Sequence, residues 1–289
     1  MINTKSLLVL VLGSLLMLIS CKEMTQILNQ LNVQEPKAQV KHVSITDLSL
    51  NKVDLLFDIA VDNPNNLGIN LNGFDYDLLL DNASFLSGKK ETKLQIGANE
   101  TASVDIPLSL TFEQVKKALK SLSSLDTIPY QLDLKLGVEL PVLGVIEVPV
   151  SKKGSFPNVR VPTVSLGGIE MGKLGLTGAD LNLKIKIKNP NTFSFNTDKL
   201  NYNLEVSGKK WISGSLPQSV AIKKKAEQTI KIPVSLNFLD MGTSVYNLLV
   251  GDSDLSYRLT GNADFNSDLK ILKTFSLPFD KSGKIKLNK

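Results

Sequence analysis

The feature that most constrains the fold of this chain is an internal repeat of its own sequence. When the 289-residue sequence is shifted by 126 positions, residues 43–112 align with residues 169–238 without a gap, and 19 of the 70 pairs are identical. Chance would give about five identities, so the sequence encodes one fold twice. We predict two domains, residues 36–158 and 159–289, which follow two segments of different character, residues 1–20 and 21–35.

Each copy is predicted to consist mainly of β-strands, because apolar and polar residues alternate along it. In the second copy one side of a strand carries Leu181, Leu183, Ile185 and Ile187, and the other side carries Asn182, Lys184, Lys186 and Lys188. Such a strand has one buried face and one solvated face, as in antiparallel sheets that pack face to face. The fold class predicted is therefore mainly β, with two tandem sandwiches.

One segment in each copy has helical spacing instead. The apolar residues concerned are Val115, Leu119 and Leu122 in the first copy, and Met241, Val245, Leu248 and Leu249 in the second. Apolar residues at this spacing line one side of a helix. We expect one short α-helix in each sandwich.

Both copies carry the tripeptide Asn-Pro-Asn at the end of a core strand, as Asn63, Pro64 and Asn65 and as Asn189, Pro190 and Asn191. Proline cannot donate a ladder hydrogen bond, so strand pairing must stop or bulge there. The asparagines can bond the freed backbone groups and tolerate left-handed φ. Because an amide has no pKa useful for acid–base catalysis, the tripeptide is interpreted as structural.

The order of motifs in each copy resembles a known family. A strand ending in Asn-Pro-Asn is followed by a strand with Tyr76 or Tyr202, a Ser-Gly turn, an Ile-Pro-x-Ser-Leu strand and a helix. This order resembles the late embryogenesis abundant (LEA) type 2 family, also called the water stress and hypersensitive response (WHy) domain. The resemblance implies a fibronectin type III-like β-sandwich with one helix, a non-enzymatic role in desiccation or other envelope stress, and no catalytic residue. Some type 2 domains also resemble lipid-binding modules with an apolar groove.

The first twenty residues resemble a bacterial lipoprotein signal peptide. Lys5 precedes an apolar stretch from Leu7 to Ile19, which is followed by the small residue Ser20. This stretch is shorter than the about twenty residues of a membrane-spanning helix. The run from Leu18 to Cys21 resembles the lipobox, whose cysteine receives a diacylglyceryl group. Cys21 is the only cysteine of the chain. Two or three fatty chains anchor a protein stably, so we expect a membrane-anchored lipoprotein of the bacterial envelope.

The residues after the cysteine bear on where the protein would sit. Lys22 replaces the aspartate that retains enteric lipoproteins at the inner membrane, which favours the outer membrane, on its periplasmic or its surface face. Residues 24–35 are polar with interspersed apolar residues, and they are interpreted as a tether. Their spacing would also suit a short amphipathic helix, although no capping pattern accompanies it.

The two copies carry charges of opposite sign. Residues 36–158 have 12 basic and 15 acidic side chains, whereas residues 159–289 have 19 and 11. A positive field of this kind suits an anionic surface such as lipid head groups, polysaccharide or an acidic envelope protein, and ordinary solvated lysines are the other interpretation. The residues proposed for such contacts are Lys184, Lys186, Lys188, Lys223, Lys224 and Lys225.

The composition and motifs of the chain give little support for an enzyme or a cofactor-binding protein. One cysteine and one histidine, His42, exclude a disulfide framework, and the residues suggest no metal site or cofactor. No carboxylate pair or phosphate-binding glycine loop stands out. Nucleic acid is not expected as a partner, because the chain has only two arginines and no reader motif. Trp211 is interpreted as a packing residue, with a binding-surface role as the alternative.

Three functions remain open at this point. The first is a lipid-anchored, non-enzymatic module that protects or binds other molecules during desiccation or osmotic stress. The alternative is a protein that binds or transfers lipid or another hydrophobic ligand, using the apolar inner strands. The third is a scaffold in which the acidic first domain of one copy pairs with the basic second domain of another.

Overall fold

The computed structural model describes residues 33–288, with the exception of residues 120, 122, 123, 142, 217, 243, 252, 253 and 273. The predicted signal peptide, Cys21 and most of the predicted tether therefore lie outside the described residues.

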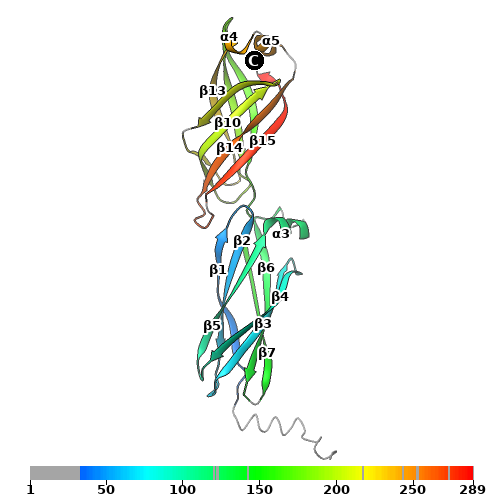
Figure 1. Cartoon of the computed structure of the whole chain (residues 1–289), viewed down its shortest axis with the longest axis vertical. Helices are drawn as coiled ribbons and strands as arrows, with labels where there is room; N and C mark the ends of the chain where they lie inside the picture. Colours follow the sequence, from blue (N-terminus) through cyan, green and yellow to red (C-terminus); the bar gives the residue numbers. More distant parts are fainter. Residues whose placement is uncertain are drawn as a thin grey trace, which may run out of the picture. The chain divides into compact units, whose positions relative to one another are not determined.

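Residues 37–157 form two antiparallel sheets, which we call the first sandwich (Figure 1). One sheet has the order β1-β2-β5 and the other has the order β4-β3-β6-β7. The strands are β1 (Lys37–Leu48), β2 (Lys52–Asp62), β3 (Ile69–Leu80), β4 (Ala83–Ile96), β5 (Thr101–Thr111), β6 (Thr127–Leu140) and β7 (Gly144–Pro157).

Residues 163–288 form two further sheets, the second sandwich, with the orders β13-β9-β8-β16 and β11-β10-β14-β15. A short strand, β12, pairs with β10 beside the second of these sheets. The strands are β8 (Thr163–Leu174), β9 (Gly178–Lys188), β10 (Phe195–Val206), β11 (Lys209–Leu216), β12 (Val220–Ile222), β13 (Glu227–Asn237), β14 (Leu255–Ser267), β15 (Phe275–Ile285) and β16 (Leu287–Asn288).

The two sandwiches repeat one topology, and the predicted mainly β fold class is confirmed. Even the strand registers correspond, since Ile69 lies opposite Ile96 and Phe195 opposite Ile222 at the same 126-residue shift. The second sandwich adds β16, which pairs in parallel with β8. The last strand of the first sandwich, β7, ends at residue 157, and the first strand of the second sandwich, β8, begins at residue 163.

Grouped by the proximity of their Cα atoms, the described residues form two compact units that do not follow this change in sheet pairing. One unit contains residues 33–43, 57–106 and 130–154, and the other contains residues 44–56, 107–129 and 155–288. The division passes through β1, β2, β5, β6 and β7. The domain boundary between residues 158 and 159 therefore stays a prediction.

The core of each sandwich comes from the alternation seen in the sequence. Along β2 the inward row Val53, Leu55, Phe57, Ile59 and Val61 is at most 1% exposed. Phe57 meets Tyr130 of the facing sheet edge to face, with ring centroids 5.7 Å apart. Burial of a large apolar side chain contributes about 1.5–3 kcal/mol, so these rows supply the main stabilising force between the sheets.

The helical segments lie close to the predicted ones, but the first helix ends before Leu119 and the second is divided. In the first sandwich α3 (Phe112–Ala118) begins with a capping box in which Thr111 and Gln114 each bond the other's backbone N–H. In the second sandwich α4 (Phe238–Met241) ends at Gly242, whose φ is 85°, and α5 (Ser244–Val250) follows. A positive φ is incompatible with a continuing right-handed helix, which explains the division.

The Asn-Pro-Asn tripeptide of the first sandwich joins three segments of chain through two buried amides. The Asn63 amide nitrogen donates to the carbonyls of Leu67 and Gly97, each at 2.8 Å. The Asn63 amide oxygen accepts from the backbone and side-chain nitrogens of Asn65, at 3.1 and 3.0 Å. Asn65 in turn bonds both backbone groups of Gln34, the N–H at 2.7 Å and the carbonyl at 2.9 Å. We call this pair the asparagine clamp.

The second sandwich repeats the asparagine clamp at every position. Asn189 donates to the carbonyls of Phe193 at 2.7 Å and Lys223 at 3.2 Å. Asn191 bonds the N–H and the carbonyl of Arg160, both at 2.7 Å. The clamp therefore ties the residues that precede the first strand of each sandwich to the end of its second strand and to the loop before β5 or β13.

A second repeated device pairs a tyrosine with a glycine on the neighbouring strand. Tyr76 lies opposite Gly88, and Tyr202 opposite Gly214. A Cβ on Gly88 would lie 2.6 Å from the Tyr76 hydroxyl, and one on Gly214 would lie 2.5 Å from the Tyr202 hydroxyl. The Ser-Gly pairs are therefore inside strands β4 and β11, and their interpretation as turns is wrong. Each glycine is required because an aromatic ring covers it.

Removing one amide of the asparagine clamp should destabilise the first sandwich. We expect Asn65→Ala to lower the free energy of unfolding by about 2–4 kcal/mol, because it removes the side-chain partner of both backbone groups of Gln34 and one of the two hydrogen bonds to the Asn63 oxygen. Urea unfolding of the full chain measures the change. Asn66→Ala, the same substitution at the exposed neighbour, is the control and should change the free energy by less than about 1 kcal/mol. Equal effects of the two variants would contradict a clamping role.

The tyrosine–glycine pair should show strong coupling between its two members. Gly214→Ala alone should lower the free energy of unfolding by about 1–3 kcal/mol, because the new methyl group overlaps Tyr202. In a Tyr202→Ala background the same substitution should be neutral or stabilising, since the ring is gone and glycine is a weak strand former. A double-mutant cycle measures this difference. Additive effects of the two substitutions would show that the Tyr202 ring is not the reason for a glycine at position 214.

Candidate functional site

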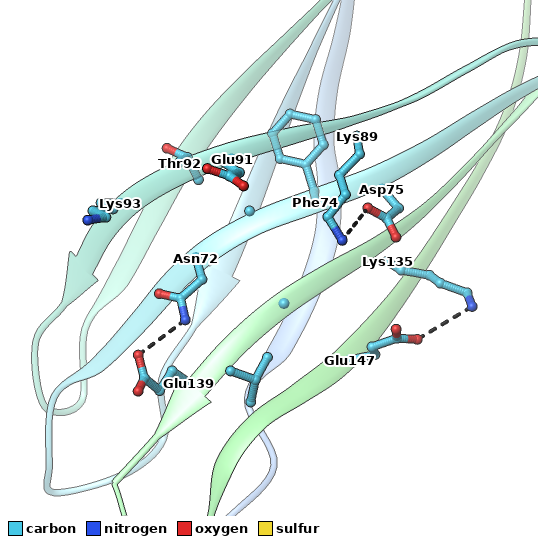
Figure 2. Close-up of a pocket in the computed structure, with 13 residues that line it drawn as sticks. Asn72, Phe74, Asp75, Lys89, Glu91, Thr92, Lys93, Lys135, Glu139 and Glu147 are labelled. Carbon is cyan, nitrogen blue, oxygen red and sulfur yellow. Dashed lines mark hydrogen bonds and ion pairs between the residues drawn. The ribbon is translucent and has the colours of Figure 1, made fainter.

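The outer face of the first sandwich carries a groove of about 710 Å³ (Figure 2). It lies over the sheet β4-β3-β6-β7, on the face turned away from the core. The groove is open to solvent along its length, and its volume falls within the range of about 300–1,000 Å³ that small-molecule sites occupy. We treat it as the candidate site.

Two glycines that face each other on adjacent strands form the floor of the groove. Gly73 of β3 lies opposite Gly137 of β6, next to a β-bulge at residues 71–73. A Cβ on Gly73 would lie 2.6 Å from the Lys90 carbonyl, so this position requires glycine. A Cβ on Gly137 would meet only ordinary contacts, at 3.7 Å from the Gly73 carbonyl and from Val145. The backbone is thus uncovered at this glycine floor, as is typical of places where a ligand approaches closely.

Charged side chains that are already paired line both sides of the glycine floor. Lys89 lies 3.3 Å from Asp75, and Lys135 lies 3.4 Å from Glu147. At the other end the Asn72 amide donates to Glu139 at 3.1 Å. The remaining polar groups of the lining come from Glu91, Thr92 and Lys93 (Figure 2). The lining therefore offers donors and acceptors of both signs and has almost no net charge.

The second sandwich has the same sheet but different residues at the positions of the floor. The positions of Gly73 and Gly137 are taken by Lys199 and Asp264, which also lie opposite each other. Asn262 donates to Asp264 at 3.0 Å and to Ser276 at 2.6 Å. Side chains thus cover the backbone where the first sandwich leaves it open.

The lysines predicted to contact an anionic surface fall into two groups. Lys184 is bonded to Glu170 and Lys186 lies 3.0 Å from Glu227, so two charges of the strand face are locally neutralised. The hydrogen bond from Lys184 holds the pKa of Glu170 below its usual value. Lys188 is exposed at the end of β9.

The other predicted lysines lie in the loop between β12 and β13, which the asparagine clamp holds. Lys223 and Lys224 are exposed, and Lys223 accepts a clamp hydrogen bond through its carbonyl. Lys225 donates its backbone N–H to the Asn191 carbonyl at 2.9 Å and has a φ of 53°. Left-handed backbone occurs here and at the matching Asn99, rather than at any asparagine of the clamp.

Trp211 is buried in the second sandwich and does not form part of an exposed surface. Its side chain is 6% exposed and borders a small apolar crevice between the two sheets, together with Leu181, Leu183 and Val234. The indole nitrogen is buried without a hydrogen-bond partner. The crevice thus contains one hydrogen-bond donor among apolar side chains.

Potential metal ligands do not gather in the part of the chain that the structure describes. There, no three histidine, cysteine, aspartate or glutamate side chains are arranged to hold a metal ion. No helix among the described residues is long and apolar enough to cross a bilayer. The sequence patterns do not predict the groove, and the one signal of it is that Gly73 and Gly137 each interrupt a strand pattern.

Comparison with known proteins gives the same family in both halves of the chain. The model of the late embryogenesis abundant protein family LEA_2 matches residues 58–154 and again residues 184–283. A soybean (Glycine max) protein, "Desiccation protectant protein Lea14 homolog", is 29% identical over 46% of this chain and 86% of its own length. Cotton (Gossypium hirsutum) "Late embryogenesis abundant protein Lea14-A" is 25% identical over 46% of this chain and 87% of its own.

A solution structure from Arabidopsis thaliana, AT1g01470, is 22% identical and covers 44% of this chain and 83% of that chain, with a TM-score of 0.38. The family model alone spans more than half of the chain, and its two matched regions lie one within each sandwich. This chain belongs to the late embryogenesis abundant LEA_2 family and carries two copies of its domain.

Proposed function

We propose that this protein is a lipid-anchored, non-enzymatic envelope protein that protects other molecules during desiccation or osmotic stress. The observation that carries the proposal is the repeated LEA_2 match, together with relatives that are named desiccation protectant and desiccation-related proteins. The anchor would be an acyl group on Cys21, in the outer membrane of a bacterium.

The surface of the fold suits a protein that must stay folded when water is withdrawn. Four outermost strands carry a proline, namely Pro107 in β5, Pro149 in β7, Pro233 in β13 and Pro278 in β15. A proline lacks the N–H that an added strand would need, so it hinders edge-to-edge association. Drying concentrates proteins, and blocked edges would let this chain act on other molecules without aggregating itself.

A second function, binding of lipid or another hydrophobic ligand, is favoured by one observation. The crevice beside Trp211 is lined by apolar side chains and contains one buried donor without a partner. Such a donor would match the carbonyl or carboxyl oxygen of an acyl chain. In the described structure the crevice holds no more volume than about one water molecule, so the sheets would have to part for a ligand.

Survival after drying tests the protective function. A strain that lacks the gene should lose viability after drying and osmotic shock, and the wild-type gene should restore it. Cys21→Ser should move the protein out of the membrane fraction and restore survival less well, because the anchor places the domains at the envelope. Unchanged survival of the deletion strain would contradict the proposal.

Native mass spectrometry of the full chain, released from detergent in the gas phase, tests the second function. Bound lipid at a fixed ratio should appear with the wild-type protein and decrease with Trp211→Phe, which keeps an aromatic ring at this position but removes the donor. A protein free of lipid, or equal lipid on both variants, would exclude this use of the crevice.

A further inference from the structure

We propose that the groove over β4-β3-β6-β7 binds a neutral oligosaccharide, and that sugar rings lie on the glycine floor of Gly73 and Gly137. This site is independent of the protective function and of the crevice beside Trp211. It belongs to the first sandwich alone, although the chain contains the same sheet twice.

The difference between the two sandwiches shows that the groove is a local departure from the shared fold. The second sandwich fills the positions of the floor with Lys199 and Asp264, and it ties Asp264 to Asn262. The fold therefore does not need glycine at the position of Gly137, where a Cβ would fit without strain. Glycine inside a strand weakens the sheet, so an uncovered floor that packing does not require points to a ligand.

The charges around the groove indicate the class of ligand. Four carboxylates, those of Asp75, Glu91, Glu139 and Glu147, stand beside three ammonium groups, those of Lys89, Lys93 and Lys135. This near balance opposes a strongly anionic or cationic ligand. A hydroxyl group both donates and accepts, so it can bond a carboxylate and a lysine at once, and charged partners strengthen such bonds.

The shape of the groove indicates a chain of sugars rather than a single small molecule. It crosses four strands, which at about 4.8 Å between neighbours gives roughly 14 Å of width, and it is open to solvent. An oligosaccharide can lie in such a groove with its ends free. The exposed side chain of Val145, which is 59% exposed at the wall, provides an apolar contact for the C–H face of a ring.

Titration of the full chain with neutral hexasaccharides tests the proposal. The protein is held in a sugar-free non-ionic detergent, and maltohexaose, cellohexaose and laminarihexaose are added to 10 mM while backbone amide resonances are followed by NMR. At least one of them should shift the Gly73 and Gly137 amides and leave those of Asn201 and Asn262, on the matching face of the second sandwich, unchanged.

Gly137→Asp should weaken this binding at least tenfold, because it places on the floor the residue that the second sandwich carries there. The variant should remain folded, since the new Cβ meets only ordinary contacts. Gly68→Asp, the same change at an exposed glycine outside the groove lining, should bind like the wild type.

Three results would overturn the proposal. The first is the absence of any shift with all three sugars, and the second is equal binding by Gly137→Asp and the wild type. The third is a shift of the groove amides by phosphoethanolamine alone, which would assign the groove to a zwitterionic lipid head group instead.

Discussion

The asparagine clamp is the interaction on which the order of both sandwiches depends. Two buried amides leave almost none of their donors and acceptors unused, and they join backbone groups that are more than thirty residues apart in sequence. Each amide replaces the ladder bonds that the proline between them prevents. The clamp therefore ends one strand, fixes the residues before another and shapes a loop at the same time. Its exact repetition explains why the tripeptide survives in both copies, where most other residues have changed.

The two copies keep their interiors and differ on their outer faces. The inward rows of β2 and β9 are equally apolar, yet Asp58 and Asp62 on the outer face of β2 correspond to Lys184 and Lys188 on β9. The Lys52 and Ser109 hydrogen bonds hold the pKa of Asp54 low on the first of these faces, and Lys184 does the same to Glu170 on the second. The repeat thus keeps one apolar interior in both sandwiches, whereas the charge of the outer face differs between them.

Sequence patterns predicted what depends on local spacing and missed what depends on pairing between distant strands. The alternation along β2 and β9 and the asparagine motif could be read directly. The sequence predicts a turn at Gly88, because glycine occurs both in turns and at strand positions that an aromatic ring covers. Only the strand register shows that Tyr76 lies over it. The groove was missed for the same reason, since Gly73 and Gly137 are 64 positions apart and become neighbours only in the sheet.

The position of the clamp has a mechanical consequence. A pulling force applied at the N-terminal end of the chain reaches Gln34 before it reaches β1, and Gln34 is held by two parallel hydrogen bonds to Asn65. These bonds must break before the first strand can peel from its sheet. Asn191 holds Arg160 in the same way. Each sandwich therefore has two hydrogen bonds that oppose its unfolding from the N-terminal end.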